Sequence, residues 1–213
     1  AGVVKSGELT ALTNYGTVSG GKYVGGLAGK TTGDGVVLGN NLENMAAIEG
    51  TGNYVGGLLG YYSRTSAYNI FDFANRGNIT GAGYIGGIFG AFYSKTNYRD
   101  NDTHFINITG ITNTGAITAS GNYAGGLFGY LEFEGVPNGE YSGYRNGAQG
   151  ANVKNAKNTG NVSGANYVGG LAGYFSTDTG ASVIEKGRSS AIIAGTEGYI
   201  GGLLGRANNV DLT

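Results

Sequence analysis

Six copies of one glycine-rich segment, Tyr-(Val/Ile/Ala)-Gly-Gly-(Leu/Ile)-x-Gly, constrain this chain more than any other feature of its sequence. Successive copies start 31, 30, 39, 44 and 32 residues apart. Self-similarity at such a period is the signature of a repeat architecture in which each unit stacks on the next. The basic unit therefore has about 31 residues, with insertions in the third and fourth intervals, and its copies start at Tyr23, Tyr54, Tyr84, Tyr123, Tyr167 and Tyr199.

A second segment, Asn-x-Gly-x-(Val/Ile)-x-Gly, precedes each copy of the first, with some substitutions. A third, looser apolar stretch follows each first segment, as at Val36–Leu38 and Phe105–Ile108. Each unit thus contains three β-prone runs separated by Gly and Asn. The first positions of the second segment are Asn14, Asn44, Asn75, Asn113, Asn158 and, in the last copy, Ser189.

These runs predict an all-β chain that winds as a β-solenoid, similar to a parallel β-helix, with about six coils of about 31 residues and three short strands in each. Helices are disfavoured because the repeats lack a 3.6-residue apolar period and Gly inside a helix costs about 1 kcal/mol relative to Ala. We expect residues 1–213 to be one repeat domain. Since the chain begins at Ala1 without Met, we also expect it to be a fragment of a larger protein.

Stacking assigns roles to the recurring residues. Equivalents of Val24 and Leu27 are expected to form aliphatic files in a single continuous interior. Because these positions are three apart, strict alternation would place them on opposite faces, so we expect a bend or bulge at the Gly-Gly pair. The Asn file is expected at a corner, with amides bonded along the axis. The six Tyr rings are expected to stack, contributing about 0.5–1.5 kcal/mol per pair.

Residues 91–104 and 130–152 interrupt the period and are expected to project as loops or hairpins. Loops on a rigid scaffold often carry binding residues, and the alternative is a hairpin that only covers the core. The second insertion is rich in aromatic and charged side chains. The candidate ligand-binding set is Tyr130, Phe133, Tyr141, Tyr144 and Arg145.

Catalytic and metal chemistry find little support in the composition. The chain has no Cys and one His, His104, which excludes a thiolate site and a His-Glu-x-x-His zinc site. Its 14 acidic residues are scattered, whereas glycoside hydrolysis needs paired carboxylates. Asp100–Asp102 offers oxygen ligands but lacks the full ligand set of a calcium loop, so a solvated loop is preferred. We predict no enzyme activity, catalytic residue, metal site or cofactor.

Charge and hydropathy argue against two kinds of partner. The 13 basic residues balance the acidic ones and form no stripe, so the footprint of a nucleic-acid-binding protein is missing. No apolar run approaches the roughly 18 residues of a membrane span. The expected partners are a host protein or a glycan, together with adjoining domains of the parent chain.

The paired segments resemble the GLUG repeat, named for a Gly-Leu-x-Gly core that here reads Gly26–Gly29 and carries Ile88 for Leu in the third copy. The resemblance covers about residues 14–206. Similar repeats occur in large secreted or wall-attached bacterial proteins, including immunoglobulin-A-cleaving zinc metallopeptidases and filamentous-haemagglutinin-like adhesins. The resemblance implies a secreted or cell-surface location.

Three functions follow in order of preference. The first is a non-catalytic repeat module that acts as a stalk, in adhesion or in ligand display. The second is an accessory domain that recruits substrate for a secreted immunoglobulin-A-cleaving metallopeptidase. The third is a glycan-active enzyme, which would require carboxylates clustered on one face of the coil.

Overall fold

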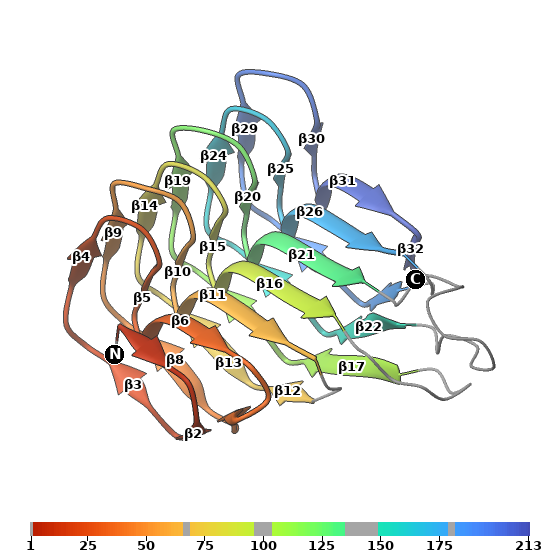
Figure 1. Ribbon diagram of the computed structural model, residues 1–213. Coiled ribbons are helices and arrows are strands. Elements are labelled where there is room, and N and C mark those ends of the chain that lie inside the picture. Colours follow the sequence, from red (N-terminus) through yellow and green to blue (C-terminus); the bar gives the residue numbers. More distant parts are fainter. Residues whose placement is uncertain (1, 66–68, 96–103, 135–148, 179–181) are drawn as a thin grey trace.

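The computed structural model of the protein describes residues 2–65, 69–95, 104–134, 149–178 and 182–213. In these ranges the chain is all-β, and its strand pairs are parallel with matching repeat positions side by side. Figure 1 shows the coils following one another along a single axis, from the red N-terminal strands to the blue C-terminal ones. The predicted β-solenoid is therefore confirmed.

Five strand positions recur along the coil and define five stacked sheets, numbered I to V in chain order. Sheet I consists of β3 (Thr13–Asn14), β8 (Leu42–Asn44), β13 (Phe73–Asn75), β18 (Thr112–Asn113), β23 (Lys157–Asn158) and β28 (Arg188–Ser189). Sheet II consists of β4 (Val18–Gly20), β9 (Ile48–Gly50), β14 (Ile79–Gly81), β19 (Ile117–Ala119), β24 (Val162–Gly164) and β29 (Ile193–Gly195). Sheet III consists of β5 (Val24–Gly25), β10 (Val55–Gly56), β15 (Ile85–Gly86), β20 (Ala124–Gly125), β25 (Val168–Gly169) and β30 (Ile200–Gly201).

The two remaining sheets contain the longer strands. Sheet IV consists of β1 (Val3–Val4), β6 (Ala28–Thr32), β11 (Leu59–Arg64), β16 (Phe89–Lys95), β21 (Phe128–Glu134), β26 (Ala172–Thr177) and β31 (Leu204–Asn208). Sheet V consists of β12 (Ile70–Phe71), β17 (His104–Thr109), β22 (Gln149–Lys154), β27 (Ser182–Glu185) and β32 (Val210–Leu212). At the same place in the first coils, β2 (Gly7–Leu9) pairs with β7 (Val36–Leu38).

The three expected runs correspond to these five strands because two of the runs are bent. The run that begins with Asn divides into a strand of sheet I and a strand of sheet II. The run that begins with Tyr divides at its Gly-Gly pair. In the first copy, the strand of sheet III ends at Gly25 and the strand of sheet IV begins at Ala28. The predicted bend at the Gly-Gly pair is therefore present, and it turns both flanking aliphatic positions inward.

The interior consists of two hydrophobic cores, so the expected single interior is wrong. The smaller core lies between sheets II and III and contains Val55, Ile79 and their equivalents. The larger core lies among sheets I, IV and V and contains Leu58, Phe73 and Phe89. The Val and Leu positions of one segment thus enter different cores, since the Gly-Gly bend lies between them.

Close backbone approach at the second glycine of the first five pairs separates the two cores. A Cβ atom built on Gly87 would lie 2.2 Å from the carbonyl oxygen of Gly126 and 2.6 Å from Cγ of Asn113. Similar crowding occurs at the equivalent positions Gly26, Gly57, Gly126 and Gly170. We call this constriction between the two cores the waist. Only glycine leaves room there for the side chains of the Asn ladder.

The Asn side chains form the expected ladder along the axis. Each amide donates to the Oδ1 atom of the next Asn, at 2.8 Å from Asn14 to Asn44, 2.7 Å from Asn44 to Asn75, 2.7 Å from Asn75 to Asn113, and 2.8 Å from Asn113 to Asn158. Each also donates to the carbonyl oxygen two residues later, which fixes the turn between sheets I and II. Ser189 is shorter than Asn, and the ladder ends before it.

Left-handed backbone occurs at the Tyr positions rather than at the ladder Asn residues. Tyr23, Tyr54, Tyr84, Tyr123 and Tyr167 have φ angles between +54° and +66°. Such a conformation is unfavourable for a bulky side chain. It turns the chain just before five of the six strands of sheet III.

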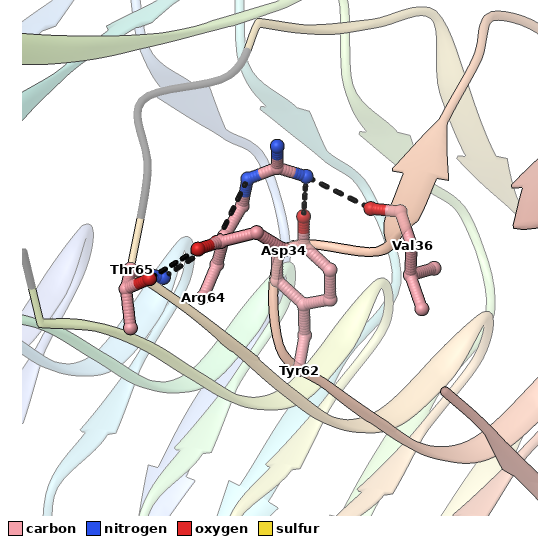
Figure 2. Close-up of polar contacts among 5 residues, drawn as sticks. All are labelled: Asp34, Val36, Tyr62, Arg64 and Thr65. Carbon is pink, nitrogen blue, oxygen red and sulfur yellow. Dashed lines mark hydrogen bonds and ion pairs between the residues drawn. The ribbon is translucent and has the colours of Figure 1, made fainter. Parts of the chain in front are cut away.

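A buried cation connects the first two coils at the turn from sheet IV to sheet V (Figure 2). Arg64 is 7% exposed, and its Nη1 donates to the carbonyl oxygen of Val36 at 2.8 Å and to the Tyr62 hydroxyl at 3.3 Å. Its Nε lies 3.8 Å from Oδ1 of Asp34, and that carboxylate accepts hydrogen bonds from the backbone nitrogen and hydroxyl of Thr65. These contacts compensate for the burial of the guanidinium group.

Strand pairing changes the boundaries of the two predicted insertions. Residues 91–95 belong to β16 and residues 130–134 to β21, while 104 opens β17 and 149–152 belong to β22. Residues 96–103 and 135–148 lie outside the described ranges, including Asp100–Asp102. Within the described ranges, no helix has the length and apolarity that a membrane crossing needs.

Candidate functional site: a tyrosine face

The six repeat tyrosines form one stack that runs the length of the solenoid. Ring centroids of successive members lie 5.1, 4.7, 4.7, 4.8 and 4.9 Å apart. We call this set the first row: Tyr23, Tyr54, Tyr84, Tyr123, Tyr167 and Tyr199. The left-handed backbone at five of them directs the rings out of the coil, where parallel strand register aligns them.

A second row of tyrosines lies beside the first, on the outer side of sheet IV. Tyr61, Tyr130 and Tyr174 occupy matching strand positions, but Ala91 takes that position in the third coil. The ring of Tyr93 fills the gap, with centroids 5.5 Å from Tyr61 and 5.2 Å from Tyr130. The two rows together form the tyrosine face of ten residues.

The two rows contact each other edge to face. Tyr54 and Tyr61 have centroids 5.4 Å apart with an interplanar angle of 89°, and Tyr123 and Tyr130 have centroids 5.3 Å apart at 85°. Aromatic pairs favour this geometry over a face-to-face sandwich. The contacts hold each ring in a fixed orientation, so the face presents a rigid array of ring edges and hydroxyl groups.

Partial burial raises the pKa values of five phenols on this face. Desolvation raises the pKa values of Tyr61, Tyr84, Tyr93, Tyr123 and Tyr130 above their ordinary value, and neighbouring phenols add to the increase. A neutral phenol both donates and accepts hydrogen bonds. The face therefore combines apolar ring surface with polar groups of both kinds, as protein binding surfaces commonly do.

Cations lie at both ends of the face. Near the first coil, Nζ of Lys22 lies 4.8 Å from the ring centroid of Tyr23, and Nζ of Lys30 lies 5.0 Å from the same centroid. Near the last coil, Cζ of Arg206 lies 5.6 Å from the centroid of Tyr199. These distances are within the range of cation–π attraction.

Glu132 contacts the second row through the Tyr130 hydroxyl. Burial raises the pKa of its carboxyl group, the hydrogen bond from the Tyr130 hydroxyl lowers it, and the charges of Glu134 and Asp178 raise it. Glu134 is paired with Lys95 at 3.2 Å. Among the described residues, no group of three or more acidic, His or Cys side chains is arranged to hold a metal ion.

The structure divides the sequence-predicted binding set. Tyr130 belongs to the second row of the tyrosine face. Phe133 is 1% exposed and packs against Phe92 and Phe175 in the larger core, so its assignment to a binding loop is wrong. Tyr141, Tyr144 and Arg145 lie outside the described residues.

Sequence reasoning missed most of the second row. Three of its four members directly follow the third glycine of the repeat segment: Tyr61, Tyr130 and Tyr174. This recurrence was the signal from which a second row could have been predicted. Tyr93 follows no repeat position. Its place in the row depends on Ala91 leaving space, which only the strand register reveals.

Comparisons of the chain with protein-family models, curated proteins and solved structures find no match.

Proposed function

We propose that this chain is a non-catalytic structural and binding repeat module of a bacterial extracellular or cell-surface protein, serving as a stalk, in adhesion or in ligand display. The resemblance to GLUG repeats supports the bacterial and extracellular part of this proposal. The stacked coils support the structural part, because axial ladders of Asn and Tyr connect each coil to the next along the whole scaffold. Binding would occur at the tyrosine face.

The continuity of the tyrosine face carries the proposal. Ten tyrosines gather on one side of the solenoid, although a stable solenoid needs only its inward-facing residues to be large. Tyr is enriched at binding surfaces because it offers a large contact area at a low cost in conformational entropy. Accessory recruitment for an immunoglobulin-A-cleaving peptidase is the alternative, and it uses the same face.

The test is ligand capture by variants that change the face and leave the fold intact. Ala91 takes the position of Tyr61 and Tyr174 in the third coil, so Tyr61→Ala and Tyr174→Ala are compatible with the coil and each removes one ring of the second row. Thr80→Ala is the matched control, since Thr80 is exposed on sheet II, away from this face. Far-ultraviolet circular dichroism would verify the fold of all three.

The whole chain would be presented to arrays of host extracellular proteins, immunoglobulin A and glycans. We expect capture of at least one ligand, with a loss of ten-fold or more in the two face variants and no change in the control. Selective capture of immunoglobulin A, together with a His-Glu-x-x-His motif in the parent protein, would favour the alternative. Absence of capture, equal capture by all variants, or turnover of any substrate would contradict the proposal.

A further inference from the structure

A hollow lies beside the first row of tyrosines at the third coil. The residue before each repeat tyrosine lies on the turn between sheets II and III. In the third coil this residue is Gly83, whereas the coils on either side carry Asn53 and Asn122. At this position lies a space of about 300 Å³, whose lining includes Asn53, Gly83, Tyr84, Ser120, Asn122 and Tyr123.

The two amides that flank the hollow are available to a ligand. Within the described part of the chain, the side chains of Asn53 and Asn122 have no hydrogen bond, and both residues are exposed. The equivalent Asn166 differs, because its Oδ1 accepts hydrogen bonds from the backbone nitrogens of Tyr167 and Tyr199 at 3.0 and 2.9 Å. The backbone around Gly83 is already paired along the axis, with its carbonyl oxygen bonded to the nitrogen of Tyr54 at 3.0 Å.

The chemistry of the lining selects a neutral, hydroxylated ligand. It contains two carboxamides, one serine hydroxyl and two tyrosine rings, and none of the lining residues is charged. A carboxamide both donates and accepts, which matches hydroxyl groups that also do both. The tyrosine rings are stacked on one another, so it is their edges that lie beside a ring-shaped ligand. A volume of about 300 Å³ is at the lower end for small-molecule sites, which indicates one or two small rings.

We propose that this hollow binds a neutral sugar residue of a glycan, with Asn53 and Asn122 hydrogen-bonded to its hydroxyl groups and Tyr84 and Tyr123 beside its ring. The inference rests on the proposed binding function and specifies one ligand class and one position for it. The rest of the glycan would extend along the tyrosine face, whose hydroxyl groups recur with every coil.

Gly83→Asn is the decisive variant, because it places in the third coil the residue that both neighbouring coils already carry. A Cβ atom at position 83 would lie 3.1 Å from the Asn122 carbonyl oxygen and 3.2 Å from Oδ1 of Asn53, so an adjustment of a few tenths of an ångström accommodates it. The added amide projects into the hollow between Asn53 and Asn122 and leaves less room for a sugar ring there. Lys22→Asn makes the same kind of change at the equivalent position of the first coil and serves as the control.

Saturation-transfer-difference NMR would be recorded on the whole chain with the methyl glycosides of glucose, galactose, mannose, N-acetylglucosamine and glucuronic acid. We expect transfer to at least one neutral glycoside and none to the glucuronide. Gly83→Asn would lose ten-fold or more of the signal, and Asn122→Ala would weaken it without filling the space. Lys22→Asn would leave it unchanged.

Two results would overturn the inference: no transfer to any neutral glycoside, or a signal that Gly83→Asn leaves intact. Either is distinguishable from failure of the proposed function. If an array ligand is captured equally by Gly83→Asn and wild type but lost in Tyr174→Ala, the binding module stands and the sugar site at the hollow is refuted.

Discussion

Gly87→Ala tests the claim that the second repeat glycine forms the waist between the two cores. The new Cβ atom would lie 2.2 Å from the Gly126 carbonyl oxygen, whereas ordinary contacts begin at 3.4 Å. The third and fourth coils would have to separate locally by about 1 Å, which breaks close packing on both sides of the waist. The backbone φ of Gly87 is not left-handed, so the effect is purely one of space.

The magnitude follows from what such a separation disrupts. Overpacking in a core costs about 1–3 kcal/mol. The hydrogen bonds from Ile88 nitrogen to Leu127 oxygen, now 2.9 Å, and from Asn75 to Asn113, now 2.7 Å, would lengthen beyond useful range. Each is worth about 1 kcal/mol. We therefore expect Gly87→Ala to lower the free energy of unfolding by about 3–5 kcal/mol.

Gly202→Ala is the matched control, because Gly202 occupies the same motif position in the last described coil and a Cβ atom there meets nothing within 4 Å. Its effect should stay within about 0.5 kcal/mol. Both variants would be measured by urea unfolding followed by circular dichroism. The reasoning is refuted if the two substitutions destabilise equally, or if Gly87→Ala costs less than about 1 kcal/mol.

Four further predictions follow from the same geometry. Ser189→Asn should extend the amide ladder to a sixth member and raise stability by about 0.5–1.5 kcal/mol, seen as a higher midpoint in thermal unfolding; an unchanged midpoint would contradict the ladder's contribution. Phe133→Ala should destabilise by about 3–5 kcal/mol in urea, as expected of a core residue, and a surface-like effect below 0.5 kcal/mol would restore the loop assignment. Ultraviolet titration should show phenols such as Tyr93 ionising above the ordinary pKa of 10.0, because folding raises that pKa. The stability that these phenols contribute is therefore full below pH 10 and falls as the pH rises further. A titration curve like that of the unfolded chain would disprove this prediction. Glu132 likewise has a pKa raised above 4.5, so the stability that it contributes below pH 4.5 should decline as the pH rises through its pKa in the folded protein. Glu132→Gln should reduce this decline in the free energy of unfolding, measured with urea at several pH values. An unchanged pH dependence would exclude Glu132 as its cause.

Much of the fold was predictable because all coils share one repeat, so equivalent residues of neighbouring coils are expected to lie side by side. The alignment of Asn44 with Asn75 and Asn113 follows from the common period, and so do the amide ladder and the tyrosine stack. The bend at the Gly-Gly pair follows from the three-residue spacing of two aliphatic positions. These predictions needed only the strand period and the repeat length.

The two cores and the binding residues were harder to predict, since they depend on contacts between different parts of the coil. The waist depends on the close approach of Gly26 to the side chain of Asn44. The repeat period does not predict that the Gly-Gly pair and the Asn segment contact each other. Phe133 was wrongly assigned to a binding loop because the predicted insertion started at Tyr130. Alternation along β21 from the outward Tyr130 to the inward Leu131 and Phe133 would have corrected it.

The backbone of the first-row tyrosines bears on whether the face has a function. Left-handed backbone costs a residue with a side chain roughly 1–2 kcal/mol, whereas a stacked ring pair returns about 0.5–1.5 kcal/mol. Five tyrosines adopt it, and stacking alone roughly offsets the strain without a net gain. Asn or Gly would tolerate this conformation better, yet every copy of the segment has Tyr. Since backbone strain is concentrated at functional sites, the recurrence of Tyr at this strained position supports the proposed binding role of the tyrosine face.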